Sequence, residues 1–121
     1  MKLYIVANRL PVKAVPRQDS YTFVRSEGGL ATGLDSLQIS MEKHWIGWPG
    51  VCVDNARQQI EIRQHLETMD FHPIFLSEEQ YHDYYEGYSN STIWPLCHYF
   101  FSHTTVRKEY WESYQKVNAL F

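Results

Sequence analysis

Two adjacent glycines, Gly28 and Gly29, stand directly before a segment whose apolar residues have helical spacing. This pairing limits the possible folds more than any other feature of the chain. The apolar residues follow at i, i+4, i+7 and i+11, on one face of a helix: Leu30, Leu34, Leu37 and Met41. A glycine turn at a helix start leaves backbone N–H groups unpaired and open to close approach, which favours an anion such as phosphate. A tight turn into an ordinary amphipathic helix is the alternative that the glycines alone leave open.

The first apolar run, Leu3 to Ala7, contains β-branched residues and predicts a strand buried on both faces of a parallel sheet. Its carboxyl end would carry Asn8 and Arg9, at the edge where open α/β sheets bind ligands. The guanidinium of Arg9 presents a planar fork of donors that suits phosphate oxygens. A surface arginine paired with Glu27 is the alternative reading of Arg9.

Strand and helix patterns alternate along the rest of the chain, which predicts an α/β fold with a mainly parallel sheet and flanking helices. At 121 residues the chain is long enough for one domain and too short for two. The predicted elements are a surface hairpin formed by 12–15 and 21–25, a strand at 45–46, a helix over 55–69, a strand over 71–76, a helix from 77 and a helix over 107–121.

Turn and cap signals set the expected boundaries of these elements. Residues 47–50, with the sequence Gly-Trp-Pro-Gly, predict a turn on which Trp48 stands. Ser77 and Gln80 have the spacing of a capping box, which predicts a helix start. Gly87 is expected to end or bend the helix that follows.

Charge, cysteine and histidine positions exclude several classes of protein. With 11 Lys and Arg against 14 Asp and Glu, the net charge is −3 and no basic stripe appears, so nucleic acid is not an expected partner. Cys52 and Cys97 are too isolated for a zinc site and are expected to be buried free thiols. The six histidines lack metal-binding spacing, so a metal site is not expected. No cofactor is expected either. The first apolar run is too short for a signal peptide or a membrane span, which favours a cytoplasmic protein.

Aromatic residues with polar tips are concentrated in the second half of the chain, around Tyr84, Tyr85 and Trp94. Such residues often line sugar sites, because a ring face packs on C–H bonds while hydroxyl and indole N–H groups bind sugar oxygens. The alternative is that they are core aromatics of a helical segment.

Five blocks, in the same order and rough spacing, resemble the amino-terminal part of the trehalose-6-phosphate synthase family of retaining glucosyltransferases. The blocks cover nearly the whole chain, and five in register are specific although each alone is weak. They are residues 6–12 (VANRLPV), 28–34 (GGLATGL), 47–50 (GWPG), 84–85 with 89–99, and 111–114 with 117–118.

The resemblance implies two Rossmann-like domains facing each other across a cleft (the GT-B arrangement), with residues 1–121 as a partial amino-terminal, acceptor-side domain truncated at its carboxyl end. It implies transfer of glucose from UDP-glucose to glucose 6-phosphate, giving trehalose 6-phosphate with retention and without a metal. Neither nucleic acid nor a membrane is an expected partner. The fragment alone is expected to be inactive, and its exposed sheet edge favours association into a homo-oligomer.

Acceptor contacts carry over to four positions by the resemblance. Arg9 matches an arginine that grips the acceptor's phosphate, and Trp48 matches a tryptophan near the same phosphate. Tyr85 and Trp94 match further acceptor contacts.

Donor contacts carry over to the glycine turn by the resemblance. Gly28 and Gly29 match a turn whose backbone meets the donor's diphosphate. The family's basic pair on that diphosphate, and its later acceptor-side Asp and Arg, lie beyond Phe121, so no catalytic residue is expected within the fragment. The stretch Asn55 to Met69 matches no family motif and is expected to be variable surface.

Two other functions are compatible with these residues. One is a non-catalytic sugar-phosphate-binding or regulatory module that keeps the acceptor half, and the other is an α/β interaction domain in which the aromatics are core. Binding of glucose 6-phosphate is expected for the enzyme and for the binding module, but not for the α/β interaction domain.

Overall fold

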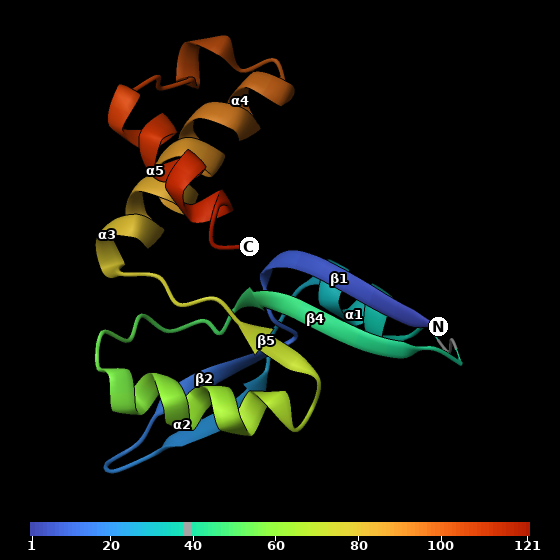
Figure 1. Cartoon of the computed structure of the whole chain (residues 1–121). Coiled ribbons are helices and arrows are strands. Elements are labelled where there is room, and N and C mark those ends of the chain that lie inside the picture. Colours follow the sequence, from blue (N-terminus) through green and yellow to red (C-terminus); the bar gives the residue numbers. More distant parts are fainter. Residues whose placement is uncertain (38–39) are drawn as a thin grey trace. The chain divides into compact units, whose positions relative to one another are not determined.

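The computed structural model describes residues 1–37 and 40–121, which form two compact units, Met1–Phe75 and Leu76–Phe121. The first unit contains all the strands of the described residues, and the second is helical (Figure 1). None of the helices in the described part of the chain is long and apolar enough to cross a membrane.

The first unit is built on a parallel sheet with the strand order β1 (Lys2–Arg9), β4 (Glu42–Trp48) and β5 (Phe71–Pro73). A parallel α/β sheet was predicted, and this part of the fold class is confirmed. The expectation of a first strand buried on both faces is wrong. Tyr4 and Val6 are 60% and 59% exposed, because only the other face of β1, which carries Ile5 and Ala7, packs against the core.

The segment between β1 and the glycine turn forms the predicted hairpin, with β2 (Val12–Pro16) antiparallel to β3 (Tyr21–Arg25). The hairpin also packs against the rest of the unit. Ala14 is buried in the core, and the Phe23 ring stacks on His65 with centroids 4.0 Å apart. Its alternating pattern explains both observations, since every second side chain faces the same side.

Helix α2 (Ala56–Glu67) begins where the Asn55 side chain accepts hydrogen bonds from the backbone N–H groups of Arg57 and Gln58. Ile62 and Leu66, four residues apart, are fully buried and join the core with Leu10, Ala14, Trp45 and Val53. The expectation that Asn55 to Met69 is surface holds for most of this stretch, which is exposed, but it is wrong for Ile62 and Leu66, which are among the largest buried side chains of the unit.

Helix α1 (Gly29–Asp35) begins at the glycine turn as predicted, but it is only seven residues long. The predicted apolar face does not form as one stripe, because Leu37 lies past the helix end and Leu30 is exposed. Residues 38 and 39, which the predicted helix would include, lie outside the described residues.

The second unit starts at the predicted capping box. The Ser77 hydroxyl accepts from the Gln80 N–H, and the Gln80 side chain accepts from the Ser77 N–H. The helix then runs on without ending at Gly87, where a Cβ would lie 2.9 Å from the ring of Tyr110. Gly87 therefore gives room to a neighbouring ring and does not stop the helix. The elements of this unit are α3 (Glu78–Tyr81), the π-helix η1 (His82–Ile93), α4 (Trp94–Cys97), the 3-10 turn η2 (Phe101–His103) and α5 (Lys108–Asn118).

Tyrosine rings hold η1 against α5. Tyr84 stacks on Tyr114 at 5.7 Å, and Tyr88 lies 4.7 Å from Tyr114 and 5.4 Å from Trp111, measured between ring centroids. Burial raises the pKa of Tyr84 above its ordinary value, with smaller contributions from the neighbouring tyrosines. For these tyrosines the core interpretation is the correct one.

The cysteines differ from the expected buried thiols. Cys52 is half-buried, and Cys97 is exposed at the last residue of α4. The exposed position follows from its place at a helix end, among other exposed residues of 96–103.

Candidate functional site

The candidate site begins where β1 and β4 end side by side. Val6 pairs with Ile46 and Arg9 pairs with Trp48. Over this stretch β1 therefore contains one more residue than β4, which is a β-bulge. The bulge comes close to Gly47, at which a Cβ would lie 2.7 Å from the Ala7 carbonyl oxygen and 2.9 Å from the Arg9 carbonyl carbon. Glycine at 47 thus permits the bulge that sets Arg9 opposite Trp48.

The guanidinium carbon of Arg9 lies 5.5 Å from the centroid of the Trp48 ring, in a cation–π arrangement. Trp48 is only 5% exposed, whereas Arg9 is exposed. Trp48 does not stand on a turn as predicted: it is the last residue of β4, and the turn follows it. The sheet therefore fixes the indole, and the indole supports a solvent-accessible cation at the carboxyl edge of the sheet.

Asn8 is the side chain at this edge that sequence reasoning did not select as a site residue. Its Oδ1 atom is buried and has no hydrogen-bond partner among residues 1–37 and 40–121. A buried acceptor without a donor costs free energy, and this cost singles out Asn8 among the polar side chains at this edge. Asn8 lies within the bulged stretch, which strand pairing reveals and the sequence does not. The signal that the sequence offered was its place next to Arg9 at the end of the first predicted strand.

The glycine turn lies before α1 and is open on its outer side. Gly28 has φ 153° and ψ 142°, a conformation that glycine adopts readily, and it precedes the helix without a side-chain cap. Within residues 1–37 and 40–121, a Cβ at Gly28 or at Gly29 would have no heavy atom of a non-neighbouring residue within 4 Å. Both residues are exposed, so the backbone of the turn is accessible to a ligand.

Tyr85 and Trp94 belong to the second unit and lie on its continuous helix. Tyr85 is half-buried and stacks on Tyr81 at 5.4 Å between ring centroids. Trp94 is 51% exposed and stacks on His98 at 4.0 Å. Among the six predicted site residues, Arg9 and Trp48 lie in contact with each other.

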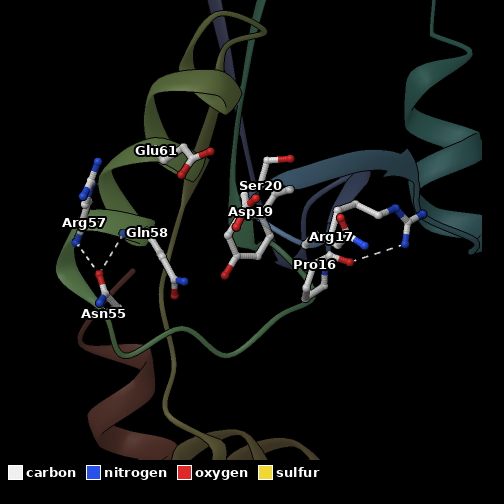
Figure 2. A pocket seen from close by; sticks show the side chains of 10 residues that line it. Pro16, Arg17, Asp19, Ser20, Asn55, Arg57, Gln58 and Glu61 are labelled. Carbon is white, nitrogen blue, oxygen red and sulfur yellow. Dashed lines mark hydrogen bonds between the residues drawn. The ribbon is translucent and has the colours of Figure 1, made fainter.

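A polar cavity of about 500 Å³ lies elsewhere in the first unit, between the hairpin turn and the start of α2 (Figure 2). Arg17, Asp19, Asn55 and Glu61 are among the residues that line it. None of the predicted site residues is among them, so this cavity is not the predicted site.

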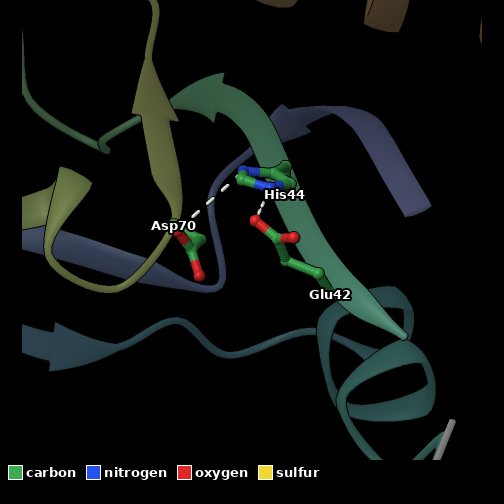
Figure 3. Close-up of side chains that lie close together, drawn as sticks. All are labelled: Glu42, His44 and Asp70. Atoms are coloured by element: carbon green, nitrogen blue, oxygen red, sulfur yellow. Dashed lines mark hydrogen bonds and ion pairs between the residues drawn. The ribbon is translucent and has the colours of Figure 1, made fainter. Parts of the chain in front are cut away.

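Side chains that could hold a metal lie at the beginning of β4. One potential ligand atom from each of Glu42, His44 and Asp70 lies within 4.8 Å of the others (Figure 3). Spacing along the sequence could not reveal this group, because Asp70 comes from the residue before β5 and reaches the other two through strand pairing.

Comparisons of the sequence with a family model and with known proteins all point to the same family. The sequence model of glycosyltransferase family 20 matches residues 1–121. A trehalose-6-phosphate synthase of Mycolicibacterium vanbaalenii is 43% identical over 97% of this chain and 24% of its own length. An alpha,alpha-trehalose-phosphate synthase [UDP-forming] of Botryotinia fuckeliana is 37% identical over 99% of this chain and 23% of its own length.

A solved structure is similar in fold. An alpha,alpha-trehalose-phosphate synthase (UDP-forming) from Burkholderia xenovorans, in complex with glucose-6-phosphate, superposes with a TM-score of 0.64 at 23% identity, over 98% of this chain and 23% of that one. The Rossmann-like, GT-B fold class is thereby confirmed for the part that the chain covers. The chain spans about a quarter of the length of the relatives that it matches.

Proposed function

Because this chain belongs to glycosyltransferase family 20, we propose that it supplies part of the acceptor-side domain of an enzyme that makes trehalose 6-phosphate. The enzyme would transfer glucose from UDP-glucose to glucose 6-phosphate. The names of the relatives support both the UDP leaving group and the product. The carboxyl edge of the parallel sheet is the expected binding edge for such ligands.

In the proposed reaction, the acceptor hydroxyl attacks the anomeric carbon from the same face as the leaving group. The new C–O bond forms as the bond from carbon to the UDP oxygen breaks, and the hydroxyl proton passes to the diphosphate. This path keeps the anomeric configuration without a protein nucleophile. The protein's work is then to position both substrates and to stabilise charge on the departing UDP.

Each predicted site residue has a role in this proposal. Arg9 binds the acceptor phosphate through its planar fork of N–H donors. The face of the Trp48 ring holds the guanidinium in place through the cation–π contact. The open backbone of the glycine turn at 28–29 meets the donor diphosphate. Tyr85 and Trp94 contact the acceptor sugar.

The single observation that carries the proposal is the contact of Arg9 with Trp48. A buried indole at the end of β4 lies 5.5 Å from the guanidinium carbon of an exposed arginine at the end of β1. An arginine held in this way has already lost much of its rotamer freedom, which lowers the entropic cost of gripping a phosphate.

The test is acceptor kinetics of the whole protein with Arg9→Ala and Arg9→Lys, using glucose 6-phosphate and glucose. A charge-assisted contact is worth about 1.5–3 kcal/mol, so we expect roughly a ten- to hundredfold loss with glucose 6-phosphate for Arg9→Ala. The loss with glucose should be small, and the affinity for UDP-glucose should hardly change. Arg9→Lys should restore activity only in part, because an ammonium keeps the charge but not the two-point geometry.

Arg17→Ala is the matched control, since Arg17 is an exposed arginine on the hairpin of the same unit. This variant should behave like the unmodified protein with both acceptors. Equal losses with glucose 6-phosphate and glucose for Arg9→Ala would mean that Arg9 serves the fold or the donor, and the acceptor role would be withdrawn.

A further inference from the structure

The polar cavity of about 500 Å³ between the hairpin turn and the start of α2 has a size that is typical of sites for small molecules. Residues 16–21 line one side of it, and the other side is lined by Asn55 and by residues of α2. Both sides belong to the unit Met1–Phe75, so the cavity is a feature of one compact body.

Packing and hydrogen bonds hold the two walls of the cavity in place. The hairpin turn is closed by the Arg17 N–H group, which donates to the Ser20 carbonyl oxygen at 2.8 Å. The stack of Phe23 on His65 joins the hairpin to α2, and α2 is anchored in the core by Ile62. A cavity with fixed walls binds a ligand at a lower entropic cost than a loop that must first become ordered.

The side chains in the cavity suit a ligand with several hydroxyl groups. Figure 2 shows Gln58 and Glu61 extending from α2 toward the hairpin turn, where Asp19 and Ser20 lie. Carboxylates accept hydrogen bonds, while an amide and a hydroxyl both donate and accept them. Tyr21, which is half-buried, adds an aromatic ring to the lining. Such a ring packs on the C–H faces of a sugar while the polar groups bind its oxygens.

The charges around the cavity favour a ligand that is neutral overall. Among the described residues that line it, Arg17 and Arg57 balance Asp19 and Glu61. The two carboxylates oppose an anion such as phosphate, and the two guanidinium groups oppose a cation. The start of α2 does not favour an anion either, because the Asn55 side chain already accepts hydrogen bonds from two backbone N–H groups there.

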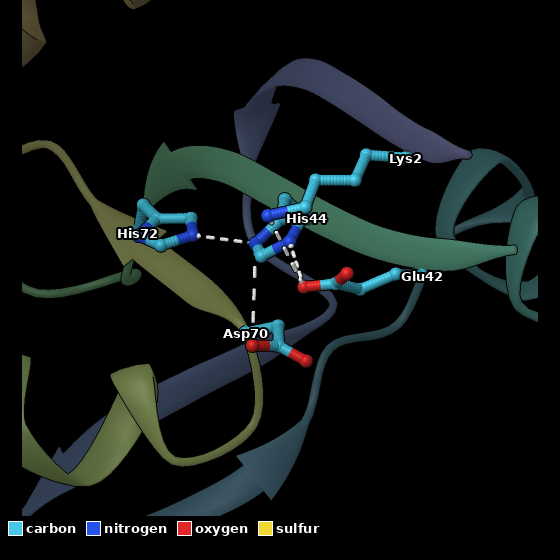
Figure 4. Close-up of polar contacts among 5 residues, drawn as sticks. All are labelled: Lys2, Glu42, His44, Asp70 and His72. Carbon is cyan, nitrogen blue, oxygen red and sulfur yellow. Dashed lines mark hydrogen bonds and ion pairs between the residues drawn. The ribbon is translucent and has the colours of Figure 1, made fainter.

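Another group of polar side chains in this unit, around His44, is arranged differently (Figure 4). The Nε2 atom of His44 lies 2.8 Å from Glu42 Oε1, and its Nδ1 atom lies 3.0 Å from His72 Nε2. Asp70 is on the Nδ1 side as well, so the two carboxylates lie on different nitrogens of the ring. These polar atoms bind one another, whereas those of the cavity border a volume that a ligand can fill.

We propose that the cavity between the hairpin turn and α2 binds a neutral sugar or a similar polyol. Glu61, Asp19 and Gln58 would bind its hydroxyl groups, and the Tyr21 ring would pack on its C–H bonds. Among residues 1–37 and 40–121, the residues that line the cavity differ from those assigned to the transfer reaction. The site is therefore additional to the proposed acceptor and donor sites and does not depend on that reaction.

The experiment is a titration of the whole protein with glucose and with trehalose, a neutral monosaccharide and a neutral disaccharide, followed by saturation-transfer-difference NMR. We expect saturable binding of at least one of them with a dissociation constant on the order of 1 mM. Neither inorganic phosphate nor saturating glucose 6-phosphate should displace the sugar from this site. The glucose 6-phosphate arm separates the cavity from the proposed acceptor site, which that compound would occupy.

Single substitutions on α2 identify the groups that bind the sugar. Glu61→Gln should weaken binding about tenfold and Gln58→Ala about threefold, because a hydrogen bond to a charged group is worth more than a neutral one. Glu67→Gln and Gln64→Ala are the matched controls, since both residues are exposed on the same helix and lie outside the cavity lining. Both control variants should bind the sugar as the unmodified protein does.

The double substitution Asp19→Asn with Glu61→Gln tests the role of charge. It removes both carboxylates and leaves two arginines in the lining, so inorganic phosphate should now bind in the cavity and displace the sugar. A purely structural role of the two carboxylates would not change the choice of ligand. Absence of saturable binding of both sugars, equal losses in the two controls, or displacement by phosphate or glucose 6-phosphate from the unmodified protein would overturn the proposal.

Discussion

Gly47 and the pair Gly28–Gly29 show two different reasons for a chain to use glycine. At Gly47 an added Cβ would lie 2.7 Å from the Ala7 carbonyl oxygen, whereas at Gly28 and Gly29 the described part of the chain places no non-neighbouring heavy atom within 4 Å of it. The first glycine is required by the close approach of a neighbouring strand. At Gly28 and Gly29 packing does not require glycine, so any need for glycine there comes from the conformation of the backbone or from a ligand. The comparison separates a fold constraint from a candidate binding element.

The largest effect is expected for Gly47→Ala, measured as the free energy of unfolding in urea. The new methyl group would collide with backbone atoms of Ala7 and Arg9, which cannot rotate away as a side chain can. We expect a loss of about 3 kcal/mol, at the upper end for overpacking. A loss below about 0.5 kcal/mol would show that the bulge in β1 can move aside, and the contrast with the glycine turn would disappear.

Gly28→Ala should destabilise the protein by about 1–2 kcal/mol, although space is available for the methyl group. The reason is the backbone, because φ 153° is a conformation that residues with a Cβ rarely adopt. Urea unfolding measures this as well. Stability equal to that of the unmodified protein would mean that the turn can adopt another conformation without loss.

Gly29→Val separates binding from stability. Gly29 has no positive φ and no close neighbour, so the free energy of unfolding should change by less than about 0.5 kcal/mol. If the turn meets the donor diphosphate, a branched side chain there should weaken UDP-glucose binding about tenfold, equivalent to about 1.4 kcal/mol. Calorimetric titration of the whole protein with UDP-glucose tests this, and an unchanged affinity would make the turn purely structural.

The smallest effect, of opposite sign, is expected for Gly33→Ala. Gly33 is an exposed residue inside α1, and among the residues that the structure describes no heavy atom beyond its own helix lies within 4 Å of its Cβ position. Alanine should stabilise the helix by about 0.5–1 kcal/mol, because glycine is the poorer helix former. A higher melting temperature would confirm it. Destabilisation would show that Gly33 also has a close contact when the protein is folded in solution.

Local signals in the sequence predicted most of the elements correctly. The capping box at Ser77 and the apolar pair Ile62 and Leu66 each act within one or two helical turns, so they can be read without the fold. The hairpin of β2 and β3 was predicted for the same reason. The predicted extension of α1 to Met41 failed because helical spacing alone does not say where a short helix ends.

The parts that sequence reasoning missed depend on pairing between distant strands. The need for glycine at position 47 comes from a bulge in β1, and the burial of Trp48 comes from its place at the end of β4. The group around His44 arises in the same way, since His72 reaches it only when β5 pairs with β4. None of these relations is visible in residue spacing along one segment.

The hairpin of β2 and β3, inserted between the paired strands β1 and β4, has a consequence for the order of folding events. Joining Arg9 to Trp48 requires closure of a long loop, whose entropic cost rises with its length. An antiparallel hairpin forms on its own within about 1–10 μs, and once formed it shortens the loop that remains. We expect the hairpin to form early and the pairing of β1 with β4 to limit the rate. The arginine at the candidate phosphate site would then reach its indole support only in the last steps of folding.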